Sequence, residues 1–600
     1  MSLFGSLYLG DSGLRTSQNA LHTVAHNLSN LNTPGYVRQQ VANSDTTYIN
    51  GGSSVRGYKF QVGTGSKYSE CRHVRDLFMD RAYRLENGRM SYYDASYSAV
   101  LEVEDILGEL DGAAFKNSVS GLWTAMQELA KDPSDTVNMS MLVSKAASFM
   151  ENASAVYKSF QEYQNNLNRQ IKDAVKDINS IGNRIYELNK EIMKIECGGV
   201  EHANDLRDER DQLLDMLSGY GNIDYTEERN NSVTVRFNGA DFVTEGHVYE
   251  MQLYTDEKTG FVTPYWNQTL SFKTDASGKR VPDYEAAAVF NLKDKISSAA
   301  NTDVGALRAL LLARGDHVAN YTDLDVSLGT DLKLDKLGIK ESAYNDKAGL
   351  KYYEDYISKS IIMNVQAEFD NIVHAIVTKV NEVLAENCDP KTKYLCNADG
   401  SPLQMFQKTN SASYEKVVLS NAEAEVLRAQ GVKLYEIYND DEELVSNVYW
   451  KYIEEDPNAP HTLYNAENAK INQKLVQTPA MLGFTKEESS VDFNIGEKFV
   501  KAFQEEGIYL NPKATDISSF ENCYIDLIRQ ASTSGYVFQG LYEYEQLALE
   551  QADNERQTVI GVSSDEELEH MIMYQNAYNA ASRYINVINS MLDTLLSMGA

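Results

Sequence analysis

The sequence predicts a multidomain α+β protein. Its terminal helices form a coiled coil, a bundle of long helices lies next to it, and β-rich and mixed α/β segments are inserted as outer domains. Three observations predict this. Both ends carry apolar residues at heptad spacing, a longer heptad run occupies residues 155–196, and apolar residues alternate with polar ones after about residue 223. A chain of 600 residues has room for about four domains.

The two terminal helices each have an apolar stripe that must be buried. The first is expected from residue 3 to residue 32, because Pro34 disfavours helix at the residue before it and Gly35 permits a turn. We expect both helices to mediate assembly; an ordinary pair of core helices is the alternative. The stripe residues are Leu7, Leu14, Leu21 and Leu28 in the first helix, and Met571, Tyr578, Ile585 and Leu592, with Ile588 and Leu595 at the second heptad position, in the last.

The segment between residue 36 and residue 220 is expected to be extended up to about residue 75 and helical afterwards. Its strongest feature is the heptad run from Phe160 to Ile195, which Gly198 and Gly199 should end. A helix at 203–217 is expected to fold back on it as an antiparallel partner. The charged run in that helix, Asp205 to Asp211, predicts a solvated or ion-paired face.

Two insertions are predicted in the second half. The alternating strand at residues 233–237 precedes Asn238-Gly239, a type I′ hairpin turn, so 221–300 should be β-rich. Helix returns at 304–314 and 353–384, around a Gly- and Asp-rich excursion at 321–350. Residues 388–520 predict a mixed α/β outer domain. The predicted domains are 1–35 with 562–600; 36–220 with 301–387 and 521–561; 221–300; and 388–520.

Composition excludes several classes of function. The net charge of −32 and the pI of about 4.7 argue against nucleic-acid and anionic-membrane partners. The start of the chain has no signal-peptide pattern, and no stretch is apolar enough to span a bilayer. Phosphate-loop, GxSxG and HExxH motifs are absent, so we predict no catalytic residue, no cofactor and no metal site. For Cys388 and Cys396, free thiols are favoured over a disulfide.

Residues 26–38, HNLSNLNTPGYVR, resemble the N-terminal signature of bacterial flagellar rod, hook and hook-associated proteins. In this motif the asparagines end a helix and Gly35 reverses the chain. The resemblance implies assembly roles for Asn27, Asn30, Thr33, Gly35 and Tyr36.

Two further segments are similar to the family of hook-associated protein 1. They are the C-terminal stretch from GVSSDEE through Met591-Leu592-Asp593-Thr594-Leu595, and the helix segment NDLRDERDQLL at 204–214. Where the family usually has Asn-Leu, this chain has Ser563-Ser564, and Ser is also a favoured helix N-cap. The resemblance adds Gly561, Val562, Asp565 and Glu566 to the assembly residues.

The resemblance implies a non-enzymatic structural subunit of the extracellular flagellum that joins hook to filament. The implied partners are the hook protein, the second hook–filament junction protein, further copies of the chain in a ring, and a cytoplasmic chaperone on the C-terminal helix. It also implies type III export without a cleaved signal peptide. Two alternatives remain: a hook or distal-rod subunit, and an axial scaffold that carries an enzymatic insertion in 388–520.

Overall fold

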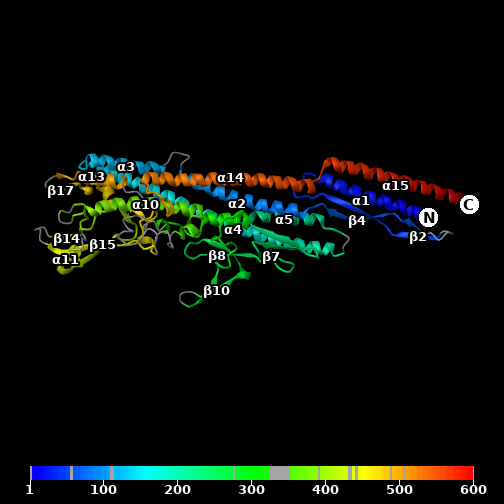
Figure 1. Cartoon of the computed structure of the whole chain (residues 1–600), viewed down its shortest axis with the longest axis horizontal. Coiled ribbons are helices and arrows are strands. Elements are labelled where there is room, and N and C mark those ends of the chain that lie inside the picture. The colour runs from blue at the N-terminus through cyan, green and yellow to red at the C-terminus, as the bar shows by residue number, and fades with distance from the viewer. Residues whose placement is uncertain are drawn as a thin grey trace.

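Long helices run along the axis of an elongated molecule, and both chain termini lie at the same end (Figure 1). In the described part of the chain, no helix combines the length and the apolar character needed to cross a lipid bilayer. The predicted α+β fold class is confirmed. This computed structural model describes the chain except for residues 1–2, 54–58, 109–113, 199–200, 275–277, 325–349, 351, 390–391, 393, 430–434, 439–443, 458, 487–489, 505–507 and 599–600.

The terminal helices α1 (Leu3–Ser29) and α15 (Ser564–Met598) pack on each other, as the heptads predict. Their direction is antiparallel, because Gly10 lies against Ile585 whereas Gly13 lies against Ala581. The segment predicted to be extended forms two hairpin-like pairs, one of which supports α1. These pairs are β1 (Gln39–Asp45) with β4 (Ser66–His73), and β2 (Tyr48–Ser53) with β3 (Lys59–Gly63).

Seven helices build the rod that continues from this pair. The longest, α4, has 61 residues and a length of about 90 Å at 1.5 Å per residue. It begins at Thr136, well before residue 155, the start of the predicted heptad run. The Asp135 side chain accepts a hydrogen bond from the Val137 N–H and caps the helix. The rod helices are α2 (Leu77–Leu107), α3 (Ala114–Lys131), α4 (Thr136–Glu196), α5 (Asn204–Tyr220), α6 (Ala306–Arg314), α10 (Ile361–Glu386) and α14 (Phe520–Ile560).

The two heptad positions of α4 differ in burial. Ile171, Ile178 and Ile185 are fully buried, whereas at the other position Leu188 is fully buried, Ile181 is half-buried and Ile195 is 45% exposed. As predicted, α5 folds back antiparallel: Arg207 binds Glu196 at 2.7 Å, and Arg210 reaches Asn189 at 3.1 Å. Of the glycines expected to end α4, Gly199 lies outside the described residues.

The predicted β-rich insertion packs on the flank of α4. Asn238 and Gly239 have φ values of 48° and 80°, as a type I′ turn requires. The Phe242 ring lies where a Cβ on Gly182 of α4 would clash, so a small residue is needed at that contact. The strands are β5 (Ile223–Glu227), β6 (Val233–Phe237), β7 (Ala240–Val243), β8 (Met251–Thr255), β9 (Val262–Trp266), β10 (Ser271–Thr274) and β11 (Arg280–Asp283).

Residues 388–520 do not form a separate core. Phe406, Tyr464 and Phe499 belong to the same buried cluster as Phe149 and Phe369 of the rod helices. The expected boundaries at 388 and 520 therefore do not coincide with a break in packing. The elements are β12 (Phe406–Lys408), β13 (Tyr414–Leu419), α11 (Asn421–Ala429), β14 (Tyr435–Tyr438), β15 (Leu444–Tyr452), β16 (Ala469–Ile471), α12 (Gln473–Gln477), β17 (Thr485–Lys486), β18 (Ser490–Val491) and α13 (Phe493–Gln504).

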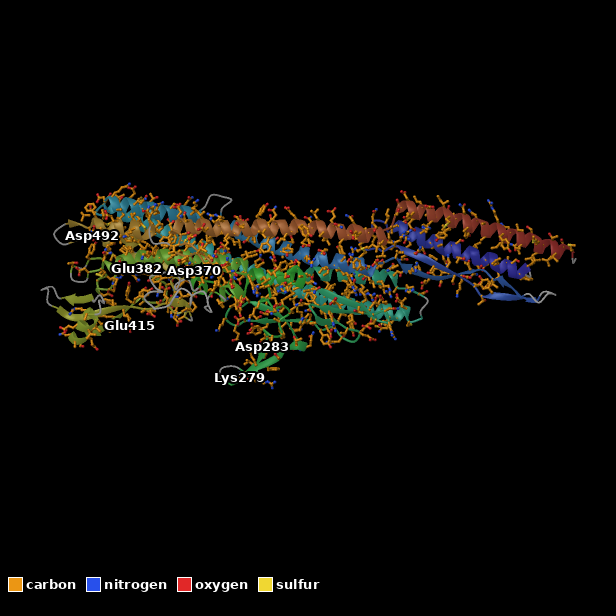
Figure 2. All side chains as sticks on the ribbon, viewed as in Figure 1. Lys279, Asp283, Asp370, Glu382, Glu415 and Asp492 are labelled. Carbon is orange, nitrogen blue, oxygen red and sulfur yellow. A yellow bond between two sulfur atoms is a disulfide. The ribbon has the colours of Figure 1, made fainter. Side chains whose placement is uncertain are left out.

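A smaller part of this segment does stand apart. The sheet β13–β15–β14 with α11, here called the outer sheet, contributes no described residue to that buried cluster. Figure 2 shows Glu415 on this sheet, away from Asp370 inside the rod. The chain enters and leaves through a narrow neck, where the Ile453 N–H donates to the Ser413 carbonyl at 3.0 Å.

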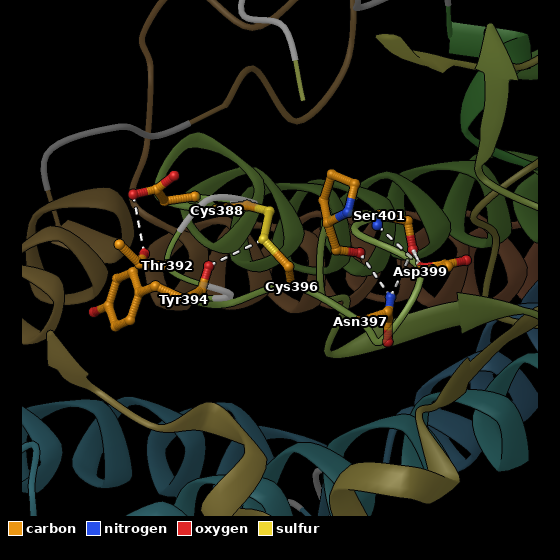
Figure 3. The surroundings of a disulfide bond; sticks show 9 residues. Cys388, Thr392, Tyr394, Cys396, Asn397, Asp399 and Ser401 are labelled. Atoms are coloured by element: carbon orange, nitrogen blue, oxygen red, sulfur yellow. Dashed lines mark hydrogen bonds between the residues drawn. A yellow bond between two sulfur atoms is a disulfide. The ribbon is translucent and has the colours of Figure 1, made fainter. Parts of the chain in front are cut away.

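Cys388 and Cys396 form a disulfide at the end of α10, so the expectation of free thiols is wrong (Figure 3). The chain turns between them, because Asp389 and Tyr394 exchange two backbone hydrogen bonds of 2.9 and 3.0 Å. That turn brings the two Cα atoms to 5.5 Å, a separation that a disulfide spans. Spacing in the sequence alone does not reveal such a turn.

Of the predicted excursion at 321–350, residues 325–349 lie outside the described residues.

Candidate assembly interface and the joint beneath it

Small residues hold α1 and α15 together. A Cβ on Gly10 would lie 2.7 Å from Ile585 Cγ1, and one on Gly13 would lie 3.7 Å from the Ala581 Cβ. The helices therefore approach closely along a face of α1 that the leucine heptad does not mark. The predicted residues Leu7, Leu14, Leu21 and Leu28 flank this seam and are half-buried.

The predicted stripe of α15 faces α1. Ile588 is only 5% exposed, and the other members near the middle are half-buried. Leu595 differs, with 55% exposure. In the antiparallel pair Leu595 lies beyond the level of Leu3, where α1 begins. The prediction that Leu595 belongs to the stripe that packs on α1 is therefore wrong. The inner stripe comprises Met571, Tyr574, Tyr578, Ala581, Ile585, Ile588 and Leu592.

A second apolar stripe runs along α15 and is exposed. Among its large side chains the exposed fraction ranges from 38% for Tyr584 to 82% for Met598. Its members recur at intervals of three and four residues, the spacing of one helix face. We call it the outer stripe; it comprises Met573, Ala577, Ala580, Tyr584, Val587, Met591, Leu595 and Met598.

The N-terminal motif residues meet the start of α15 at a joint between the terminal pair and the rod. Its centre is Asn27, which is 1% exposed. The Asn27 Nδ2 group donates to the Gln39 carbonyl at 2.9 Å and to Glu567 Oε2 at 3.0 Å. Asn27 Oδ1 accepts from the Tyr36 hydroxyl at 2.7 Å and from the Gln39 N–H at 3.1 Å. All four hydrogen-bonding positions of this amide are therefore occupied.

Glu567 is the acidic residue that completes the joint. The motif predicted its neighbours Asp565 and Glu566 as assembly residues, but not Glu567 itself. It is 2% exposed and also accepts from Arg38 Nε at 2.9 Å. The predicted Glu566 lies farther out and pairs with Arg38 Nη1 at 2.9 Å, while Asp565 is exposed in the first turn of α15. The Ser563 hydroxyl accepts from the Glu566 N–H at 3.4 Å, so the N-cap role expected of serine is confirmed.

The other motif residues shape the turn. Asn30 and Thr33 bond to each other at 3.1 Å, and Asn30 also donates to the His26 carbonyl. Gly35 has a φ of 79°, a left-handed conformation that favours glycine. Burial raises the pKa of the Tyr36 hydroxyl, which stays a donor to Asn27.

Three arginines and three aspartates form a network directly below the joint. Arg75 bonds to Asp80 and also to Asp211 at 2.6 Å, and Arg84 bonds to Asp211 and to Asp215 at 2.7 Å. Arg556 of α14 completes the set by binding Asp215 at 2.7 Å. In the charged run of α5, Arg207, Glu209 and Asp211 are ion-paired, one of the two outcomes expected for it. The carboxylates of Asp211 and Asp215 tie α2, α5 and α14 together.

Asp208 and His73 form a buried pair at the edge of this network, with 3.5 Å between Asp208 Oδ1 and His73 Nδ1. Burial raises the pKa of Asp208 to about 7 and lowers the pKa of His73 to about 4. The distance alone would suggest an ion pair. Because burial acts against both charges, we assign an uncharged imidazole here at neutral pH. The Asp208 carboxyl also accepts from the Val37 N–H at 3.2 Å.

Gly561 and Val562 connect α14 to α15 across the joint. A Cβ on Gly561 would lie 2.4 Å from the Gln557 carbonyl oxygen, so this position requires glycine. The Arg38 N–H donates to the Ile560 carbonyl at 2.9 Å and fixes the end of α14. A cavity of about 270 Å³ lies here, lined by the turn residues Asn30 to Val37, by Asp215 and by Gly561. The joint thus unites both predicted motifs.

Comparisons with known proteins show that three segments of this chain are similar to models of flagellar protein families. A model of the FlgK flagellar hook-associated protein helical domain matches residues 100–393. A model of the C-terminal part of the FlgEFG flagellar basal body rod proteins matches residues 559–598, and a model of the flagella basal body rod protein matches residues 7–36.

Full-length relatives are also found. Flagellar hook-associated protein 1 of Bacillus subtilis is 23% identical over 99% of this chain and 98% of its own length. Flagellar hook-associated protein 1 of Escherichia coli is 22% identical over 98% of each chain. The flagellar hook junction protein FlgK from Burkholderia pseudomallei has a solved structure that covers 80% of this chain and 100% of its own, with 11% identity and a TM-score of 0.49.

Proposed function

We propose that this chain, which belongs to the family of flagellar hook-associated protein 1, is a structural subunit that joins the hook of the bacterial flagellum to its filament. The relatives that match it along nearly their whole length carry that name. The helical-domain match to residues 100–393, which contain α4, favours this role over that of a hook or distal-rod subunit.

The observation that carries the proposed mode of assembly is the outer stripe of α15. After α1 has covered the inner stripe, one whole apolar helix face remains exposed over residues 573–598. Apolar side chains repeated at this spacing are stabilised when another helix covers them. The outer stripe is therefore the surface through which the terminal pair contacts its neighbours in the flagellum.

Charge supports the same conclusion. The chain carries a net charge of −32, yet residues 1–35 contain one acidic and one basic residue, Asp11 and Arg15. Residues 571–600 likewise contain one of each, Arg583 and Asp593. Copies that converge at their terminal helices thus avoid the self-repulsion that the rest of the chain would cause.

The partners follow from this role. Copies of the chain form a ring, with the hook protein on one side and the second hook–filament junction protein on the other. A cytoplasmic chaperone covers the outer stripe before type III export, because an exposed apolar helix face favours aggregation. The subunit acts outside the cell and has no enzymatic activity.

The test introduces a charge into the outer stripe. Val587→Asp places a carboxylate in the apolar contact, at a cost of several kcal/mol if it is desolvated without a partner. Asn586→Asp adds the same charge one residue away on an exposed position and is the matched control. We expect cells with Val587→Asp to export the protein but to lack filaments, whereas Asn586→Asp cells swim normally.

Normal filaments with Val587→Asp would overturn this mode of assembly. Imaging of immunolabelled flagella tests the location separately. Label confined to the hook–filament boundary is expected, and label along the hook or at the rod would identify a different axial subunit.

A further inference from the structure

In the described part of the chain, a second unpartnered apolar face lies on the rod itself. Tyr536, Val537, Leu541, Tyr544 and Leu547 are between 37% and 78% exposed and share one side of α14. We call these five residues the α14 patch. The opposite side of the helix packs on α2, where Gly535 lies against Val100 and Glu104 and where Glu545 is buried. Tyr536, Tyr544 and Leu547 are thus largely uncovered by the described part of this chain.

The composition of the α14 patch is that of an interface core. Two of its five residues are tyrosines and the rest are aliphatic, and α14 has neither Lys nor Arg between Arg529 and Arg556. Aromatic residues are enriched and charged residues are depleted at the centres of protein–protein interfaces. The flank of the patch is acidic, with exposed Glu543 and Glu550.

The position of the patch indicates a second copy of this chain as its partner. Helix α14 leads into α15 through the short connection at 561–563, and the two helices form one continuous edge of the molecule (Figure 1). Side chains stand out along that whole edge in Figure 2. Copies that meet through the outer stripe of α15 therefore also bring their α14 helices close to a neighbour.

A surface of complementary charge lies on another rod helix, α4. The segment 158–176 of α4 has four basic residues and two acidic ones, a net charge of +2 in a chain whose total is −32. Its basic side chains are exposed and recur along one side of the helix. We call it the α4 basic strip; it comprises Lys158, Arg169, Lys172 and Lys176.

We propose that the α14 patch of one copy packs beside the α4 basic strip of the next copy. The lysine and arginine stems cover the apolar side chains, and their charged ends meet Glu543 and Glu550. Two different faces of the same chain meet in such a contact, so it repeats from copy to copy around a ring. This inference rests on the proposed function, because it requires copies to assemble side by side.

A photo-crosslinking amino acid in the assembled protein tests the contact. We replace Tyr544 with p-benzoylphenylalanine in the full chain, irradiate cells that carry flagella, and analyse the products by mass spectrometry. A product of twice the 67.3 kDa chain mass is expected, joined to a peptide that contains part of residues 158–176. The same probe at Gln546, which is exposed and lies outside the five residues of the patch, beyond Glu543 and Glu550 around the helix, is the matched control and should give less product.

The alternative outcomes are distinct. No product from position 544, a product with a different protein, or a product with another segment of a second copy overturns the inference. A probe at Val587 in the outer stripe separates this failure from failure of the proposed function. If Val587 crosslinks to a neighbour and Tyr544 does not, the proposed function survives alone. If neither position crosslinks, both proposals fail.

Truncation of the patch provides a second measurement. Tyr544→Ser with Leu547→Ser should leave the melting temperature of the purified protein unchanged, because both side chains are about two-thirds exposed, at 66% and 67%. We expect the number of filaments per cell to fall about tenfold, since a few buried anchors contribute most of the binding energy of an interface. Gln546→Ser is the control. An unchanged filament number would contradict the contact.

Discussion

Removal of the Asn27 side chain should detach the terminal helix pair from the rod while leaving both helices intact. In Asn27→Ala, three hydrogen bonds to neutral partners are lost, two with the Gln39 backbone and one with Tyr36. A fourth bond, to the Glu567 carboxylate, is lost as well. At about 1 kcal/mol for each neutral bond and about 1.5 kcal/mol for the charged one, the cost is about 4.5 kcal/mol.

The Gln39 amide reports on this change directly, because its N–H donates to Asn27 Oδ1 at 3.1 Å. A loss of about 4.5 kcal/mol corresponds to roughly a two-thousandfold change in the opening equilibrium. We therefore expect native-state hydrogen exchange to accelerate by about that factor at Gln39 and in the first turn of α15. Amides in the middle of α4 should be unaffected.

The matched control is Asn19→Ala, an exposed position on the same helix. Both variants gain the same small helix propensity from alanine, so their difference isolates the contacts of Asn27. The reasoning is refuted if Gln39 exchanges at the same rate in the two variants. It is also refuted if Asn27→Ala slows exchange at Gln39, since the Asn27 side chain would then not stabilise the joint.

Three further predictions follow from the geometry. Because its folded pKa is raised to about 7, Asp208 contributes stability below its ordinary pKa and loses it as the pH rises toward 7. The free energy of unfolding of Asp208→Asn, relative to the wild type, should therefore rise between about pH 4 and 7 by about 4 kcal/mol at most, and stay constant above pH 7. Denaturation curves measured across this pH range that show no such rise would contradict the prediction. Replacing residues 414–452 with a short Gly-Ser linker should preserve folding and filaments, whereas deleting residues 388–520 should unfold the rod. Equal melting curves for the two variants would show that residues 388–520 do not share the core of the rod. Ile585→Asp should block assembly while the rod stays folded. Normal swimming of cells with this variant would show that assembly does not require the inner stripe.

The sequence determined the elements whose signals are local. Heptads located α1, α4 and α15, and the Asn238-Gly239 pair located a hairpin, because these patterns act within one helix or one turn. The residues of the motif around Asn27 and of the motif around Gly561 were predicted to mediate assembly, which stays a prediction. That they meet at one joint was not predicted, because neither motif names the atom that it contacts.

Other features depended on packing between distant segments. Periodicity shows that a helix has an apolar face but does not show whether that face is covered. The outer stripe of α15 became recognisable only once α1 had occupied the inner one. Likewise Glu566 and Glu567 are adjacent in the sequence, and only the turn of α15 decided that Glu567 faces Asn27.

The sequence by itself therefore determined which segments are helices, which ends pair, and which residues mark the flagellar motifs. The tertiary structure alone decided that 388–520 shares the core of the rod, that Cys388 bonds to Cys396, and that α14 and α15 keep apolar faces free. The physical reason is the range of the interactions. Helix and turn preferences act over a few residues, whereas burial depends on which distant surfaces arrive at the same place.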